Sequence, residues 1–253
     1  MKYKEGFGPF VENIIHVEMN NINSLKQVFE KHGKNISAIL YEPIQGEGGI
    51  VVMNNEFVTT METLKMKYPK ILFMADEIQC GLGRVGSLTA SSKIFPNLKP
   101  DVLILGKALS GGILPISCVL SNNNSMSVFT PGTHGSTFGG NPLACAISME
   151  SIDVIEKECI PNVINVQQNL KYNLSKLLCK SLLHKHIVDI RGMGLFYGVQ
   201  FNDKYNLEAL RLRMLDAGYI TCTSRNNTMR ITPPLTISIS EIKKAVDKLQ
   251  ELI

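Results

Sequence analysis

The stretch FMADEIQCGLGRVGSLTASSKIFPNLKPDVLILGK, residues 73–107, decides how this chain folds. Two short apolar runs, residues 71–75 and 102–105, have the length and composition of buried strands. Each run leads into a charged residue, Asp76 after the first and Lys107 after the second. Because parallel strands end at the same edge of a sheet, we expect both charges where open α/β folds bind their ligands.

The rest of the chain predicts an α/β region followed by a separate α+β unit. Strands alternate with helices before residue 150, which is typical of a mostly parallel sheet. The expected strands lie at 36–41, 71–75, 102–105 and 116–120, and the expected helices at 23–32, 57–67 and, buried, at 144–156. The later region predicts a long amphipathic helix at 162–183, strands near 187–190, 194–201, 219–223 and 228–231, and helices near 205–217 and 239–252. We place the domains at 1–158 and 159–253.

The composition excludes several classes of protein. Hydrophobic residues make up 44% and charged residues 19%, as in ordinary globular proteins. The net charge of +4 is spread along the chain, whereas nucleic-acid binding needs a clustered basic face. We find no apolar run long enough to span a membrane and no secretory signal. The 6 cysteines form no CxxC pair, which fits reduced thiols in an intracellular protein, and the 5 histidines show no zinc spacing.

The segment 81–86, GLGRVG, matches the dinucleotide fingerprint GxGxxG, but its context does not. The fingerprint needs a strand that leads almost directly into the first glycine and a helix that follows. Here the residues DEIQ intervene, and residues 87–100 lack a convincing helical pattern. Asp101, the acidic residue farther along, precedes a strand instead of ending one. A flexible loop explains these glycines better than a nucleotide site does.

Lys107 and Asp76 are the residue types that hold pyridoxal phosphate. A lysine amine in a partly desolvated crevice can condense with a carbonyl group. An aspartate at the pyridinium nitrogen keeps that nitrogen protonated, so that the ring withdraws electrons from a carbanion. The spacing alone leaves a second reading open, in which Lys107 is a solvated loop lysine.

Longer motifs along the whole chain strengthen the first reading. They are AILYEPIQGEGG (38–49), ADEIQCGLGRVG (75–86), PDVLILGKALSGG (100–112), GTHGSTFGGNPL (132–143), IRGMGL (190–195) and MRITPPL (229–235). Together they resemble the class III aminotransferases, pyridoxal-phosphate enzymes of fold type I. GFGPF at 6–10 and the run at 132–144 are most similar to the ornithine aminotransferases of this family. Acetylornithine and 4-aminobutyrate transaminases share most of the rest.

The resemblance implies an α/β fold with two parts: an incomplete large domain with a mostly parallel sheet, and a C-terminal α+β small domain. It also implies cofactor roles for five residues. Lys107 would hold the cofactor covalently and shuttle a proton, Asp76 would pair with the pyridinium nitrogen, and Gln79 would bond the phenolic oxygen. Ser136 and Thr137 would reach the cofactor phosphate of a neighbouring subunit, which implies a homodimer with shared active sites.

Arg230 and Glu47 resemble the family's substrate-binding pair. Arg230 would take the α-carboxylate of glutamate or 2-oxoglutarate, since its planar fork suits bidentate binding. Glu47 would cover Arg230 when ornithine binds and swing away when 2-oxoglutarate binds. Without the resemblance, Glu47 reads as a solvated loop acid. The implied reaction transfers the δ-amino group of L-ornithine to 2-oxoglutarate and gives glutamate 5-semialdehyde and glutamate.

The chain also departs from the family pattern. Cys80 and Val85 stand where the family usually has threonine, and two extra residues fall within 87–99. Three parts of the family's site lie upstream of GFGPF: the S-G-x-E-A phosphate loop, the aromatic residue that stacks on the cofactor ring, and the groups that bind the α-carboxylate of ornithine. We therefore expect this chain to be the last three-fifths of such an enzyme. The alternatives are an acetylornithine or 4-aminobutyrate transaminase and a catalytically silent fragment. We expect a cytoplasmic location, with the mitochondrial matrix as the alternative.

Overall fold

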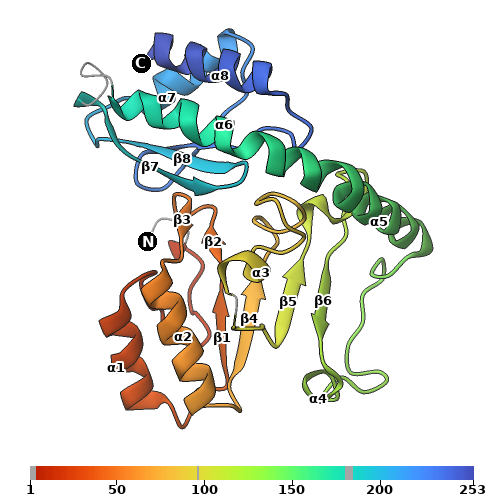
Figure 1. Ribbon diagram of the computed structural model, residues 1–253. Coiled ribbons are helices and arrows are strands. Elements are labelled where there is room, and N and C mark those ends of the chain that lie inside the picture. Colours follow the sequence, from red (N-terminus) through yellow and green to blue (C-terminus); the bar gives the residue numbers. More distant parts are fainter. Residues whose placement is uncertain (1–3, 96, 180–184) are drawn as a thin grey trace.

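The computed structural model describes residues 4–95, 97–179 and 185–253. It contains two four-stranded sheets, which we name sheet A (β1-β4-β5-β6) and sheet C (β7-β8-β10-β9). Sheet A lies in the lower half of Figure 1 and sheet C in the upper half. This arrangement confirms the expected α/β fold with a mostly parallel sheet and a separate C-terminal α+β unit.

Sheet A supplies the edge on which the site depends. Its strands are β1 (Ala38–Tyr41), β4 (Leu72–Asp76), β5 (Val102–Leu105) and β6 (Cys118–Ser121). β1, β4 and β5 run parallel, and β6 pairs with β5 in the antiparallel sense. In the register of β4 and β5, Asp76 lies opposite Ile104. The expectation that these two strands are parallel neighbours is therefore confirmed.

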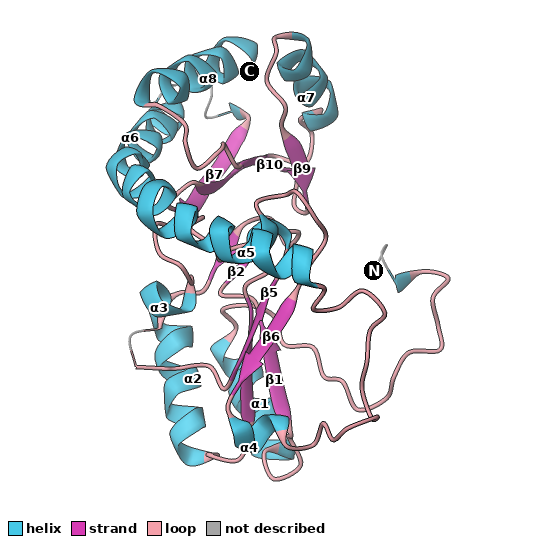
Figure 2. Ribbon diagram, turned by 90° about the vertical axis from the view of Figure 1, so that its right-hand side faces the viewer, coloured by secondary structure: helices cyan, strands magenta, loops and turns pink. Residues whose placement is uncertain are grey.

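Two helices cover one face of sheet A, as Figure 2 shows. They are α1 (Ile22–His32) and α2 (Asn55–Lys67). Each begins at an asparagine whose side chain accepts a backbone N–H of the first turn, a favourable helix cap. Their apolar sides pack with the inward side chains of β1 and β4 into one buried core. Burying such side chains contributes roughly 1.5–3 kcal/mol each.

The opposite face of sheet A is open. Leu40 on β1 is 63% exposed and Val119 on β6 is 51% exposed. The helix expected at 144–156 is present as α5 (Pro142–Val154), but the expectation that it is buried was wrong. Met149 in its middle is 72% exposed, because apolar composition alone does not show whether another segment covers a helix.

Some short elements had no clear sequence signal. β2 (Ile44–Gln45) and β3 (Val51–Val52) form an antiparallel hairpin between β1 and α2. α3 (Ser91–Ile94) is one turn of helix after the glycine-rich loop, and η2 (Lys107–Ser110) is a 3₁₀ turn after β5. α4 (Asn123–Met126) follows β6.

Sheet C is antiparallel throughout. Its strands are β7 (Ile187–Met193), β8 (Phe196–Phe201), β9 (Cys222–Ser224) and β10 (Thr228–Ile231). The helices α6 (Ile160–Cys179), α7 (Leu207–Asp216) and α8 (Ile239–Leu252) share one buried core with this sheet. The helix expected at 162–183 is confirmed as far as Cys179, and its last residues lie outside the described part of the chain.

A π-helical segment, η3 (Ile155–Cys159), joins α5 to α6. The division predicted after residue 158 falls within it and stays a prediction. Among the described residues, no helix combines the length and the apolar character that a membrane span requires.

The glycine-rich loop 81–86 lies against the C-terminal unit. The Leu195 N–H donates to the Arg84 carbonyl oxygen over 3.0 Å, and Arg84 Nη1 donates to the carbonyl oxygens of Leu195, at 3.3 Å, and Pro233, at 2.5 Å. A Cβ placed on Gly194 would lie 2.5 Å from the Val85 Cα, so only glycine allows this approach. The loop therefore packs the two units together, a role that its resemblance to a nucleotide fingerprint does not suggest.

Candidate active site

Three neighbouring strands of sheet A deliver charged residues to one edge. Glu42 follows β1, Asp76 ends β4, and Lys107 follows β5 after Gly106. The pKa of the Glu42 carboxyl is raised, chiefly by burial, and is also raised by the charge of Asp76 and lowered by the charge of Lys107. Both Asp76 and Lys107 are therefore close enough to Glu42 to act on its charge.

Lys107 is exposed and has an unusual backbone. Its φ of +46° lies in the left-handed region, which residues with a side chain rarely adopt. Such a conformation costs on the order of 1–3 kcal/mol and is concentrated at functional sites. It starts the tight turn η2, whose last residue, Ser110, is buried and accepts the Leu114 N–H at 3.2 Å. Lys107 therefore lies at the sheet edge, on a turn that the hydrogen bond between Ser110 and Leu114 stabilises.

Asp76 and its neighbour Glu77 have different roles. Asp76 is half-buried, and its Oδ1 accepts the Ile78 N–H at 3.0 Å. Glu77 is fully buried and accepts the N–H groups of Ala90 and Ser91 at the start of α3. Burial, more than any other influence, raises the pKa of Glu77. Asp76 is thus available to a ligand, whereas Glu77 holds the following loop.

Gln79 points at the loop between β2 and β3. A Cβ placed on Gly46 would lie 1.1 Å from Gln79 Oε1, so this glycine makes room for the amide. Gln79 Nε2 lies 3.5 Å from Glu47 Oε1. Its buried Oε1 has no hydrogen-bond partner within the part of the chain that the structure describes. The side chain therefore retains hydrogen-bonding capacity that the protein does not satisfy.

Glu47 and Arg230 form an ion pair between the two units of the chain. Glu47 lies in the loop after β2, and Arg230 lies on β10. Their side chains are 59% and 17% exposed, so a largely covered guanidinium meets an accessible carboxylate. The pair that the resemblance predicts is formed between residues far apart in the sequence.

Ser136 and Thr137 lie elsewhere. Both are exposed on the loop before α5, where Ser136 Oγ accepts the Gly139 N–H at 3.1 Å. Among the described contacts, neither residue bonds to Asp76, Gln79 or Lys107. Their predicted role at a neighbouring subunit stays a prediction.

The sequence interpretation assigned no role to Glu42 or Arg191. Glu42 follows an apolar run in the way that Asp76 does, so the same argument could have found it. Arg191 lies in the quoted motif IRGMGL, but its contacts reach residues that are distant in the sequence. Only the folded chain shows them.

An acid and an amine at the carboxyl ends of adjacent parallel strands lie where open α/β sheets bind their ligands. The family model for Aminotransferase class-III matches residues 1–253. The chain belongs to the class III aminotransferase family.

Individual relatives agree with this assignment. The chain is 40% identical over 252 residues to ornithine aminotransferase 1 of Staphylococcus saprophyticus, covering 99% of this chain and 61% of the relative. The crystal structure of the ornithine aminotransferase from Toxoplasma gondii matches with a TM-score of 0.90 at 33% identity, over 98% of this chain and 58% of that one. Acetylornithine aminotransferase from Elizabethkingia anophelis matches with a TM-score of 0.87 at 38% identity, over 98% and 62%. The chain thus spans about three-fifths of these relatives.

The residues present fit pyridoxal phosphate, on which this family depends. Lys107 supplies an accessible amine, Asp76 an available carboxylate and Gln79 an amide whose Nε2 carries a second N–H besides the one that donates to Glu47. These are the donor and acceptor types that an aldehyde, a protonated ring nitrogen and a phenolic oxygen require.

Proposed function

We propose that this chain carries the chemistry of an ornithine aminotransferase, which moves the δ-amino group of L-ornithine to 2-oxoglutarate. The products are glutamate 5-semialdehyde and glutamate. The ion pair between Glu47 and Arg230 is the observation that carries the proposal. An arginine masked by a removable carboxylate suits an enzyme that must accept two substrates of different charge at one site.

The residues at the sheet edge divide the work. When bound, pyridoxal phosphate supplies the carbonyl group and the electron-withdrawing ring. The Asp76 carboxylate would keep the ring nitrogen protonated, and Gln79 Nε2 would donate a hydrogen bond to the phenolic oxygen. The Lys107 amine would act as a general base toward the proton on the substrate carbon and then, as a general acid, deliver that proton to C4′ of the cofactor.

Glu47 gives the site its choice between substrates. While Glu47 neutralises Arg230, the guanidinium offers no free charge to the α-carboxylate of ornithine, and the δ-amine is the group that reaches the reacting centre. A dicarboxylate such as 2-oxoglutarate competes for Arg230 through a bidentate contact, which displaces Glu47. The exposure of Glu47 leaves it room to move.

A sibling activity is the second candidate, because the acetylornithine enzyme from Elizabethkingia anophelis is 38% identical to this chain. The test offers ornithine, N-acetylornithine and 4-aminobutyrate to the protein with 2-oxoglutarate and excess cofactor. Preference for ornithine supports the proposal. Preference for the acetylated substrate overturns it, because N-acetylornithine keeps a free δ-amine and carries its acetyl group on the α-nitrogen, so that preference would identify an acetylornithine transaminase.

A third candidate is a catalytically silent chain. The open face of sheet A and the 61% coverage of the relative favour it. Titration of the purified chain with pyridoxal phosphate, followed by absorbance, separates the two readings. A saturable cofactor band and turnover support the enzyme, whereas the absence of both supports the silent chain.

We also propose that the active form is a homodimer in which Ser136 and Thr137 serve the neighbouring site. Their exposure on a loop away from Lys107 supports this. The bacterial relatives support a cytoplasmic location, whereas a relative from Arabidopsis thaliana is named as a mitochondrial ornithine aminotransferase, which supports the mitochondrial alternative. Cell fractionation tests the location, and light scattering with and without cofactor tests the dimer.

A further inference from the structure

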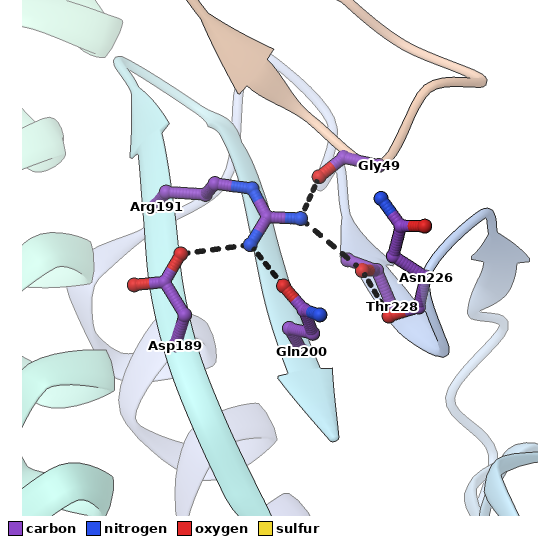
Figure 3. A network of polar contacts seen from close by, with 6 residues as sticks. All are labelled: Gly49, Asp189, Arg191, Gln200, Asn226 and Thr228. Carbon is purple, nitrogen blue, oxygen red and sulfur yellow. Dashed lines mark hydrogen bonds and ion pairs between the residues drawn. The ribbon is translucent and has the colours of Figure 1, made fainter. Parts of the chain in front are cut away.

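Arg191 on β7 makes four polar contacts but has no role in the site described above. Nη1 donates to Asp189 Oδ2 and Gln200 Oε1, both at 2.7 Å, and Nη2 donates to the Gly49 carbonyl oxygen at 2.5 Å and to Thr228 Oγ1 at 3.3 Å. Figure 3 shows the guanidinium between sheet C and the loop that carries Gly49. Nη1 thus bonds within sheet C, whereas Nη2 joins the sheet to a segment of the N-terminal unit.

The loop in question, residues 46–50, rests on a row of three residues across sheet C. Arg191 lies opposite Gly198 on β8, and Gly198 lies opposite Arg230 on β10. Residues directly opposite one another on adjacent strands point to the same face. Arg191 and Arg230 therefore flank a position that has no side chain.

Ile50 fills the space above that position. It is fully buried, with a φ of +56°. A Cβ placed on Gly198 would lie 3.1 Å from the Ile50 Cβ and 2.8 Å from the Thr228 Cγ2. Glycine at 198 is what lets the loop approach the sheet.

The two flanks of the loop are held by the two arginines. On one flank, the Glu47 carboxylate pairs with Arg230, and the Glu47 carbonyl oxygen accepts the Arg225 N–H at 3.3 Å. On the other flank, Arg191 holds the Gly49 carbonyl oxygen. Arg230 must release Glu47 whenever a dicarboxylate binds, but nothing in that exchange requires Arg191 to release Gly49.

We propose that Arg191 is a positioning residue that keeps the 46–50 loop on sheet C, so that Glu47 returns to Arg230 after each exchange. The effect of Arg191 on substrate choice rests on the proposed function, whereas the anchoring of the loop does not. Lysine cannot replace arginine here, because one ammonium group cannot hold the Asp189–Gln200 side and the Gly49–Thr228 side at once.

The anchoring is tested by amide hydrogen exchange on the 253-residue chain. In Arg191→Gln we expect the amides of residues 46–50 and of Arg225 to exchange about tenfold faster, because the loop opens locally without global unfolding. We expect the same faster exchange in Arg191→Lys. This variant keeps the charge and the aliphatic stem, so it still tests the inference if Arg191→Gln fails to fold. Arg211→Gln is the matched control, since the described ion pair of Arg211 is local, with Glu208 on the same helix, α7.

The pattern of exchange decides the outcome. Faster exchange confined to these segments supports a positioning role. Unchanged exchange of the loop overturns the inference, and so does an equal increase along β7 and β8, which would mean that Arg191 only stabilises the sheet.

The consequence for selectivity is measured separately, as the ratio of kcat/KM for glutamate to that for ornithine. We expect Arg191→Gln to raise this ratio, as Glu47→Gln does. Arg191→Lys should raise it as well, and added salt should not restore the wild-type ratio. If the loop opens but neither variant changes the ratio, the proposed substrate switch is wrong while the anchoring stands.

Discussion

At the scale of single residues, Lys107 is the group on which the chemistry depends. Its exposed amine and left-handed backbone distinguish it from an ordinary surface lysine. A competing amine exists at Lys93, where Nζ donates to the Val85 carbonyl oxygen at 2.6 Å and burial lowers the pKa. A lowered pKa leaves a larger fraction of the amine unprotonated and able to react, so Lys93 is the natural control.

We predict that borohydride reduction of the chain with pyridoxal phosphate labels Lys107. Peptide mapping by mass spectrometry checks this. Lys107→Ala should lose the label almost completely, and Lys93→Ala should keep it. A label that persists in Lys107→Ala and disappears in Lys93→Ala would remove Lys107 from the site.

Glu47→Gln should change which amino donor the enzyme prefers. The amide cannot neutralise Arg230, so the guanidinium becomes free for an α-carboxylate. We expect kcat/KM for glutamate relative to ornithine to rise about tenfold, equivalent to ~1.4 kcal/mol of transition-state free energy. Steady-state kinetics with both donors measures it. Glu56→Gln, an exposed acid in the first turn of α2, should leave the ratio unchanged.

These residue-level roles were predictable only in part. Asp76 and Lys107 follow apolar runs, so the sheet edge could be deduced from local pattern. The partners of Arg191 and Glu47 lie far away along the chain, and spacing alone says nothing about them. For Glu47, the family resemblance supplied the partner that local pattern could not.

At the scale of elements, strong local periodicity was a reliable guide. β5 and β10 have the expected bounds, and α8 matches its predicted range at both ends. The hairpin of β2 and β3 was missed because two-residue strands show no periodicity. It is nevertheless the element that carries the loop of Glu47.

The short helix α3 depends on a buried acid, which gives a prediction about pH. The pKa of Glu77 is raised above its ordinary value of 4.5 because the carboxyl is buried. The folded chain therefore keeps this proton at pH values where the unfolded chain has lost it. Its contribution to stability is fully present below pH 4.5 and is lost as pH rises through the folded-state pKa.

Glu77→Gln removes that dependence, since an amide does not titrate. We expect the free energy of unfolding of the wild type, minus that of the variant, to fall as pH rises above 4.5, by at most ~1.4 kcal/mol per pH unit. Urea unfolding at a series of pH values measures this difference, in which the other titrating groups cancel. Parallel curves for the two proteins would contradict the assignment.

At the scale of the whole molecule, the two units are joined by buried polar contacts that the sequence did not indicate. Arg84 is the clearest example, because its guanidinium is half-buried and donates to two carbonyl oxygens of the C-terminal unit. Burial lowers its pKa to about 10. The sequence suggested a flexible loop here, since composition cannot show which surface a loop meets.

Arg84→Met should weaken the whole fold. The substitution leaves the Leu195 and Pro233 carbonyl oxygens without this donor, and each lost hydrogen bond to a charged group costs about 1.5–3 kcal/mol. We expect a loss of about 3 kcal/mol in the free energy of unfolding, measured in urea. Arg213→Met, on the exposed side of α7, should cost less than 1 kcal/mol, as roughly expected for surface substitutions. Equal losses in the two variants would show that Arg84 has no special role in joining the units.

The transfer of one particular nitrogen is the central claim about this molecule. Ornithine labelled with ¹⁵N at the δ position, incubated with the protein, 2-oxoglutarate and excess pyridoxal phosphate, follows that nitrogen directly. Mass spectrometry of the glutamate formed should find the label, and its formation should stop in Lys107→Ala. Unlabelled glutamate, formed from the α-amino group instead, would contradict the proposed activity.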